Sequence, residues 1–257
     1  MPSIETNIQI WNEGYDWTKL GDEWSQAWGG EDIQWYGVIL PRIQAYLTEK
    51  NGNLQTGTIL EIAPGFGRWT KYLKNFCEKL VVVDLSEKCI EACQIRFKDC
   101  SNLEYHVNDG KSLEMIEDNS LNFAFSMDSL VHAEEEAIAA YLEQLPQKLT
   151  RNGIGFIHHS NYEKFVDVPG HINQHMRATT MSAEKFKRLA EEYQLKCLSQ
   201  ELVNWGCDSL IDSFSVVAKQ ESDWNISYKM LENNNFMQEA AHLKKLSELY
   251  GNKRVYS

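Results

Sequence analysis

A short run rich in small residues is the strongest chemical signal in this sequence. Residues 60–68 read Leu-Glu-Ile-Ala-Pro-Gly-Phe-Gly-Arg and connect a predicted strand over 58–62 to a predicted helix. Gly65 and Gly67 have no Cβ, so the backbone can approach a ligand closely at these positions. The run lacks the third glycine of the dinucleotide pattern G-x-G-x-x-G, and it lacks the Gly-Lys-Ser/Thr of a phosphate-binding loop.

Asp84 is the second signal. It ends an apolar, β-branched run over 79–84, 17 residues after Gly67. A carboxylate at the end of the second strand can accept hydrogen bonds from both hydroxyls of a ribose, a geometry that also serves NAD. Because ligands of an open α/β sheet bind at the carboxyl ends of its strands, we expect Asp84 and the glycine run to face one pocket.

Histidines follow two later predicted strands and are candidate bases. His132 lies four residues after Asp128, beyond the fourth strand, and His158 and His159 end the fifth. Neighbouring residues of a strand point to opposite faces, so at most one of this pair faces the pocket. We expect His159, which lies nearer the mouth, to act with His132 and Asp128 as the catalytic set. A structural role is the alternative for each histidine.

A long irregular segment over 161–181 follows the fifth strand. Segments of this length inside a compact domain are usually functional. Arg177 could hold a phosphate or carboxylate of an acceptor, although an ordinary surface loop has the same composition. The candidate substrate-binding residues in and before this segment are His158, Asn161, Tyr162, His175 and Arg177.

The residues rich in Asp and His also raise the question of a metal ion. Mg²⁺ prefers carboxylates and water, whereas a set rich in histidine suits zinc or iron better. No H-x-x-E-H or H-E-x-x-H spacing is present. We therefore expect no required metal.

Composition and charge narrow the class of protein. The 257 residues are 43% hydrophobic and 24% charged, with a formal net charge of −12. We expect no nucleic-acid partner, because an acidic chain repels phosphate backbones. The sequence shows no long apolar run and no basic-then-apolar leader, so we expect neither a membrane span nor a signal peptide. Six cysteines without a CxxC pair predict reduced thiols in a cytoplasmic protein, which could be a monomer or a homodimer.

The order of predicted elements indicates the fold class. Strands alternate with helices in the middle of the chain, which predicts a doubly wound, mostly parallel α/β sheet. Two strand-like runs over 195–203 and 210–218 form a hairpin, so we expect an antiparallel final strand. The chain divides into a helical cap over 1–54, the α/β domain over 55–220 and a helical tail over 221–257.

The predicted cap is rich in aromatic residues, with seven Trp and Tyr residues in its first 36 positions. Such a segment is too apolar for a free tail. We expect it to pack on the α/β domain and to exclude water from the pocket.

The glycine run resembles motif I of the class I S-adenosylmethionine (SAM) methyltransferases, E/D-x-G-x-G-x-G, with Ala63 in place of the first glycine. Alanine is the next smallest side chain, but we do not expect it to adopt a left-handed backbone easily. The resemblance extends over about residues 55–220. It implies a seven-stranded sheet whose seventh strand is antiparallel, with SAM as the cofactor and S-adenosyl-L-homocysteine as its product.

Longer stretches resemble a narrower bacterial group of these enzymes, which is associated with glycan, surface-polysaccharide or secondary-metabolite biosynthesis. These stretches are the one from Gln34 to Ile43, then EIAPGFGRWT, VDLSEKCIEAC, YHVNDGKSL and GFIHHSN.

The resemblance also implies roles for single residues. An acid after the third strand faces the adenine amino group, and the fourth strand leads into the methyl-transfer loop. Arg68 could meet the SAM carboxylate, with a solvated helix start as the alternative, and Trp35 and Tyr36 are expected near the methionine end. The expected cofactor-binding residues are Glu61, Ala63, Gly65, Gly67, Arg68, Asp84, Leu85, Asn108, Asp109, Gly110, Ser126, Trp35 and Tyr36.

Three functions are compatible with this interpretation. The first is transfer of a methyl group to a hydroxyl or phosphate oxygen of a small-molecule or glycan-type acceptor. The second is N-methylation of an amine or amide, on a small molecule or a peptide natural product. The third is a SAM-binding module without turnover, supported only by the alanine in motif I. The net charge disfavours a nucleic-acid methyltransferase, and no N/D-P-P-Y or Pro-Cys motif is present.

Overall fold

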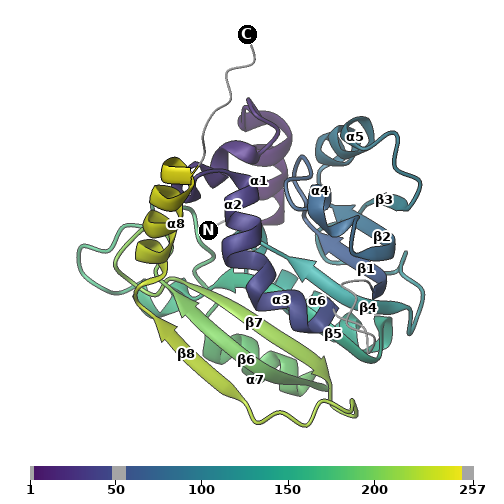
Figure 1. Cartoon of the computed structure of the whole chain (residues 1–257). Helices are drawn as coiled ribbons and strands as arrows, with labels where there is room; N and C mark the ends of the chain where they lie inside the picture. The colour runs from purple at the N-terminus through teal and green to yellow at the C-terminus, as the bar shows by residue number, and fades with distance from the viewer. Residues whose placement is uncertain (1–2, 48–55, 251–257) are drawn as a thin grey trace.

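One mixed β-sheet organises the chain. The computed structural model describes residues 3–47 and 56–250. The strands lie in the order β3-β2-β1-β4-β5-β7-β6-β8 (Figure 1). They are β1 (Thr56–Ile62), β2 (Cys77–Asp84), β3 (Leu103–Val107), β4 (Leu121–Ser126), β5 (Leu149–Ser160), β6 (Leu195–Val203), β7 (Asp212–Lys219) and β8 (Lys229–Asn233).

Helices connect the strands and precede them. The N-terminal ones are α1 (Ile4–Ile8), η1 (Gln9–Gly14), η2 (Asp22–Trp28), α2 (Glu31–Gln34), η3 (Trp35–Ile39) and α3 (Leu40–Leu47). The later ones are α4 (Thr70–Leu73), α5 (Glu87–Arg96), η4 (Leu130–His132), α6 (Glu135–Lys148), η5 (Tyr162–Phe165), α7 (Ala183–Glu192) and α8 (Phe236–Tyr250). The expected boundary between cap and domain, at residues 54 and 55, lies outside the described residues, as do both chain ends.

The parallel strands bring the glycine run and Asp84 to the same edge of the sheet. β1 lies between β2 and β4, and all three run in the same direction. Ile62 is in register with Val83, and Glu61 is in register with Phe125. The loops that follow these three strands therefore begin at the same level, which places the glycine run beside Asp84.

The other half of the sheet is mostly antiparallel. β7 runs antiparallel to both β5 and β6, which confirms the predicted antiparallel strand. β8 pairs parallel with β6 and makes the sheet eight-stranded rather than seven-stranded. This strand lies in the segment predicted as a helical tail. Ile226, Tyr228 and Met230 alternate with polar residues, and asparagines over 233–235 end the strand, so the segment carries a short strand signal that the helical-tail prediction does not use. Only α8 matches the tail prediction.

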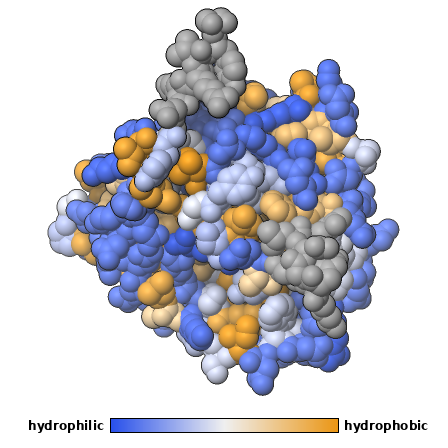
Figure 2. All heavy atoms as spheres, in the orientation of Figure 1, coloured by the Kyte–Doolittle hydropathy of each residue, from blue (hydrophilic) through white to orange (hydrophobic). Residues whose placement is uncertain are grey.

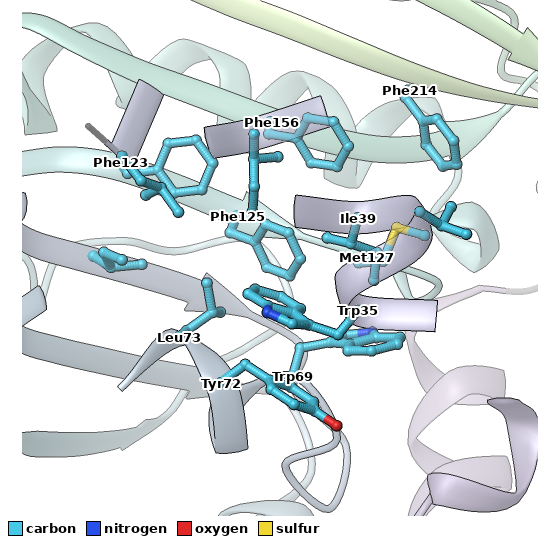
Figure 3. Packing of buried hydrophobic residues seen from close by; sticks show 14 of the residues in the cluster. Trp35, Ile39, Trp69, Tyr72, Leu73, Phe123, Phe125, Met127, Phe156 and Phe214 are labelled. Atoms are coloured by element: carbon cyan, nitrogen blue, oxygen red, sulfur yellow. The ribbon is translucent and has the colours of Figure 1, made fainter. Parts of the chain in front are cut away.

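Two apolar cores cover the two faces of the sheet. Ile59 and Leu60 are neighbours on β1, so their side chains point to opposite faces, and each belongs to a different core. The first core contains the N-terminal helices and a group of aromatic rings around Trp35 and Phe125 (Figure 3). The second contains α6 and α7. Helices on both faces of a mostly parallel sheet confirm the predicted doubly wound fold.

The surface of the molecule is mostly hydrophilic on the face seen in Figure 2, where apolar residues form small separate groups. None of the helices within residues 3–47 and 56–250 is long and apolar enough to cross a bilayer.

Candidate active site

A cavity of about 490 Å³ lies at the carboxyl edge of the parallel strands. Its walls combine the N-terminal segment, the glycine run, the end of β2 and the loops that follow β3 and β4. The chain leaves β1 and β4 towards opposite sides of the sheet, and open α/β sheets bind ligands at such a switch point. The predicted ligand-binding turn and Asp84 therefore do share one pocket.

The glycine run forms a turn with three residues in the left-handed region. Ala63 has φ 58°, Gly65 has φ 58° and Gly67 has φ 84°. The expectation that Ala63 would avoid this conformation is wrong. Hydrogen bonds hold it on both sides, because its N–H donates to Val83 O (2.7 Å) and its carbonyl accepts from Ser129 Oγ (2.6 Å). These bonds offset the roughly 1–2 kcal/mol that an L-residue loses in this region.

The two glycines of the run also admit aromatic neighbours. A Cβ on Gly65 would lie 2.9 Å from the ring of Trp17, and a Cβ on Gly67 would lie 2.5 Å from the ring of Phe97. Trp17 stacks on Phe66 with ring centroids 4.3 Å apart. The absent side chain of Gly65 thus lets the N-terminal segment lie directly on the turn, and that of Gly67 admits Phe97 at the end of α5.

Asp84 links the glycine turn to the end of β2. Its Oδ2 accepts from the Gly65 N–H (3.2 Å), and its Oδ1 accepts from the Ser86 N–H (2.8 Å). Burial raises the pKa of Asp84 to about 7, although these backbone hydrogen bonds oppose the shift. Each carboxylate oxygen keeps a second lone pair, and Asp84 lines the cavity, so it can still accept hydroxyl groups of a ligand.

Glu61 lies behind the turn rather than in the cavity wall. It is fully buried, and its Oε2 accepts from Thr70 Oγ1 at 2.5 Å. Burial raises the pKa of Glu61 to about 8; the bond from Thr70 opposes this shift, and the charge of Asp84 adds to it. Direct binding of the cofactor by Glu61 stays a prediction, and in this structure the side chain bonds to Thr70 of α4 and does not line the cavity.

The loop after β3 contributes backbone rather than an acid. Gly110 of this loop lines the cavity, and so does Leu85, which follows β2. Asn108 accepts from the Gly110 N–H (3.0 Å) and donates to Tyr141 Oη (3.1 Å). Asp109 accepts from two backbone N–H groups that follow it, which lowers its pKa. Asn108 and Asp109 therefore shape the loop, and neither side chain lines the cavity.

Arg68 and Asp128 form a buried ion pair in the cavity wall. The Arg68 Nη2 lies 2.8 Å from Asp128 Oδ2, and the guanidinium lies 4.5 Å from the ring of Trp69. Asp128 adopts φ 60°, a conformation that aspartate tolerates better than most residues. The expected contact of Arg68 with a cofactor carboxylate would have to compete with this pair.

His132 is the histidine that lines the cavity. Its Nδ1 lies 3.0 Å from the carbonyl oxygen of Met176, so Nδ1 must carry the proton of the neutral ring. Its Nε2 has no hydrogen-bond partner among the described residues and is the nitrogen left for a ligand. Burial and, to a smaller extent, the charge of Arg177 lower the pKa of His132 to about 4, although the hydrogen bond to Met176 opposes this shift.

The two histidines of β5 do point to opposite faces, but the expected choice between them is wrong. His159 packs in the second face of the sheet, stacked on Phe186 at 4.1 Å and hydrogen bonded to Ser215 Oγ (2.7 Å). It cannot act as a base in the cavity. His158 lies behind the cavity wall, where its Nδ1 accepts from the Asp128 N–H (3.0 Å).

The other residues expected to bind substrate or cofactor also lie outside the cavity wall. Arg177 forms a buried pair with Asp212, with distances of 2.9 and 2.6 Å. Its charge is therefore already compensated and does not face the pocket. The further residues that the structure places outside the wall are Gly67, Ser126, Asn161, Tyr162 and His175.

Trp35 and Tyr36 were expected near the methionine end of the cofactor, and the structure places both elsewhere. Trp35 is fully buried in the first core, stacked on Tyr72 at 4.8 Å (Figure 3), and Tyr36 is 60% exposed. Neither lines the cavity. Three tryptophans nearer the N-terminus line it instead: Trp11, Trp17 and Trp24.

The N-terminal segment is attached to the cavity rim at several points. Asn7 Nδ2 donates to the carbonyl of His132 (3.0 Å), Asn12 is hydrogen bonded to Ser86, and Asp22 pairs with Arg96 (2.9 Å). The contribution of α1 was not predicted, because its short polar sequence has no motif. The aromatic content of the segment predicted a water-excluding cover, and the structure places aromatic rings there.

The cavity wall fits a nucleoside and an amino acid side chain. A buried carboxylate at Asp84, a left-handed turn without bulky side chains at its glycines, and apolar side chains such as Leu85 and Met127 all line it. No group of three His, Cys, Asp or Glu side chains within 3–47 and 56–250 is arranged to hold a metal ion.

Residues 59–153 match a family described as a methyltransferase domain. No curated protein matches the chain significantly. The matched segment runs from β1 into β5, and it contains the glycine turn, Asp84, Asp128 and His132.

Solved structures share the fold over most of the chain. One is the PH0226 protein from Pyrococcus horikoshii, with TM-score 0.54, 18% identity, and coverage of 77% of this chain and 98% of that one. Another is an S-adenosylmethionine-dependent methyltransferase from Clostridium acetobutylicum, with TM-score 0.54, 14% identity, and coverage of 76% and 92%. The methyltransferase in a complex with the Haloferax volcanii activator Trm112 has TM-score 0.54, 15% identity, and coverage of 79% and 96%.

These identities establish the fold alone. The matched segment identifies a methyltransferase domain within the chain, and SAM is the cofactor that such a domain indicates. The residues that would hold its nucleoside are the turn around Gly65 and the carboxylate of Asp84.

Proposed function

We propose that this chain transfers the methyl group of SAM to a hydroxyl oxygen of a small-molecule acceptor, glycan-type acceptors included, with His132 as the general base. The observation that carries this proposal is the position of His132 in the cavity wall, with Nδ1 bound to Met176 and Nε2 left for a ligand. When bound, SAM supplies an activated methyl group on a sulfonium.

The protonation state of His132 suits the removal of a hydroxyl proton. A hydroxyl has a pKa far above 7, so a positioned base assists as the new bond forms. Because the pKa of His132 is lowered to about 4, its ring is neutral at pH 7 and the Nε2 lone pair is available. The charges of Asp128 and Asp212 act in the opposite direction on this pKa and stabilise the proton once His132 has taken it.

A phosphate acceptor is disfavoured by the state of the two arginines. Arg68 is paired with Asp128, and Arg177 is paired with Asp212. A phosphate oxygen would have to displace a carboxylate to bind either arginine, and a further cation of the wall, Lys111, is already paired with Glu136. A neutral hydroxyl requires no such exchange.

An amine acceptor is disfavoured for a similar reason. A protonated amine would be held by free carboxylates, but Asp128 is already paired and Glu134 accepts from the N–H groups of Thr179 (3.2 Å) and Thr180 (2.9 Å). The acidic groups of this part of the wall are therefore engaged within the protein.

The aromatic cover contributes by keeping the reaction dry. Trp11 lies 5.4 Å from the ring of His132, and it packs against Trp17 and Trp24, each 6.0 Å away. Exclusion of water strengthens the interactions of the polar groups in the wall and prevents hydration of the base.

Three matched acceptor panels test the proposal. The protein is incubated with methyl-labelled SAM and with sugar and aliphatic alcohols, with amines of the same scaffolds, and with their phosphate esters. We expect label in an ether from the alcohol panel. Label on nitrogen or on phosphate alone would contradict the hydroxyl assignment. Binding of SAM without transfer to any panel would favour a module without turnover.

A further inference from the structure

A buried carboxylate on β7 is linked through neighbouring residues to Asp128 and His132 of the cavity wall, although it does not line the cavity itself. Asp212 is fully buried. Its two oxygens accept from Arg177 Nε (2.9 Å) and Nη2 (2.6 Å), and Oδ2 also lies 3.2 Å from His158 Nε2. One carboxylate thus meets a loop residue on one side and a strand residue on the other.

The branch through His158 ends at Asp128. The His158 Nδ1 accepts from the Asp128 N–H at 3.0 Å, so Nδ1 is unprotonated and the ring proton is on Nε2. Nε2 lies 3.2 Å from Asp212 Oδ2 in an electrostatic contact whose geometry is not that of a hydrogen bond. Asp128 is in the left-handed region, and this bond holds its backbone there. The side chain of Asp128 is thereby directed at Arg68 in the cavity wall.

The branch through Arg177 ends at His132. Arg177 follows Met176, whose carbonyl accepts from His132 Nδ1. Met176 has φ 50°, a conformation that costs a side chain such as methionine roughly 1–2 kcal/mol. Asn173 clamps the next residue by accepting from the Arg177 N–H (2.7 Å) and donating to the Arg177 carbonyl (2.8 Å). Arg177, which Asp212 and Asn173 anchor, therefore holds the Met176 carbonyl in place.

The charge state of Asp212 agrees with this geometry. Burial raises its pKa, but Arg177 and His158 more than offset that effect, and the pKa lies below its ordinary value. The carboxylate is ionised, and the arginine is neutralised where it lies.

We propose that Asp212 is a positioning residue: through Arg177 and Met176 it fixes the tautomer of His132, and through His158 it fixes the backbone of Asp128. This inference rests on the proposed function, because it assigns His132 the role of base. It explains why Arg177 faces inward from the segment over 161–181 instead of facing an acceptor.

Ring nitrogen signals test the inference without an acceptor. Two-bond ¹H–¹⁵N correlation spectra of the seven histidines are recorded at pH 7, with His132 and His158 assigned by His132→Gln and His158→Gln. In the wild type we expect His132 protonated on Nδ1 and His158 on Nε2. The opposite tautomer at His132 would overturn the inference before any further variant is made.

Asp212→Asn then breaks the network. We expect the His132 signals to move towards a mixture of tautomers, while the dissociation constant of SAM, measured by calorimetry, stays within about 2-fold. Because Arg177 would be left as an unpaired buried charge, the double variant Arg177→Gln/Asp212→Asn is measured as well. The inference is overturned if His132 keeps the wild-type signals in a folded variant of either kind.

Glu163→Gln is the matched control. Glu163 pairs with Lys185 in the first part of the same segment and makes no contact with His132. We expect unchanged His132 signals. Failure of methyl transfer to any alcohol, with the expected tautomers present, would contradict the proposed function alone, so the two failures are distinguishable.

Discussion

The two halves of the cavity are built by different means. In the cofactor half, which consists of the glycine turn with Asp84, Leu85 and Gly110, Asp84 accepts from the Gly65 N–H across 19 residues of chain. In the acceptor half, Asn7 bonds to the carbonyl of His132 across 125 residues, and the wall consists of side chains from distant segments. The first half is therefore specified locally, whereas the second exists only after the whole fold has formed.

This difference should separate cofactor binding from methyl transfer. Changes in the acceptor half should alter transfer without altering cofactor binding, and changes in the cofactor half should alter binding first.

His132→Gln is expected to have the largest effect. Glutamine can still bond to the Met176 carbonyl, but it cannot take up a proton. We expect turnover to fall about 100- to 10,000-fold, with the SAM dissociation constant unchanged, as measured by label transfer and calorimetry. His159→Gln is the control, and we expect it to lower the melting temperature but to keep the turnover of folded protein. Unchanged turnover in His132→Gln would show that His132 is not the general base.

Asp84→Asn is expected to weaken SAM binding by roughly 100-fold, because hydrogen bonds to a charged group contribute about 1.5–3 kcal/mol each. Calorimetry with SAM measures this effect. Asp109→Asn is the matched control, since the side chain of Asp109 lies outside the wall, and we expect less than about a 2-fold change. Equal losses in both variants would mean that Asp109, in the loop after β3, contacts the cofactor after all.

Trp17→Ala tests the contact between the cover and the glycine turn. Stacked aromatic pairs contribute about 0.5–1.5 kcal/mol beyond their buried area, so loss of the stack on Phe66 should weaken SAM binding roughly 2- to 10-fold. Trp17→Phe should recover most of the affinity, and Tyr36→Ala, an exposed position in the same segment, should have no effect. Tight binding in Trp17→Ala would show that the turn does not need its cover.

Glu61→Gln is expected to have the smallest effect on function and a clear effect on stability. The pKa of Glu61 is about 8 in the folded protein and ordinarily 4.5. Its contribution to stability is complete below pH 4.5 and is lost as the pH rises through 8. Urea unfolding across this range should show a smaller pH dependence in the variant. A larger dependence would contradict a raised pKa for Glu61.

The fold could be predicted well from sequence, and the cofactor half in part. Strands that alternate with helices predicted the doubly wound sheet, and the position of Asp84 at the end of the second strand predicted that it shares a pocket with the glycine turn. Ala63 was misjudged, because its left-handed conformation depends on the bond from Ser129, which no local pattern records.

The acceptor half could be predicted only in part. His132 was among the candidates. His159 was preferred to His158 because it lies nearer the end of β5, but the order of the two residues does not show which face of β5 α7 covers. Arg177 resembles a phosphate-binding residue until Asp212, 35 residues later, is placed beside it. Buried pairs between distant segments are therefore what sequence patterns miss here.

A crystal structure with S-adenosylhomocysteine tests the central claim most directly. We predict that the ribose hydroxyls bond to Asp84 and that the sulfur lies on the side of the cavity where His132 Nε2 faces it. A ribose bound away from Asp84, or a sulfur remote from His132 with Trp11 between them, would contradict this account.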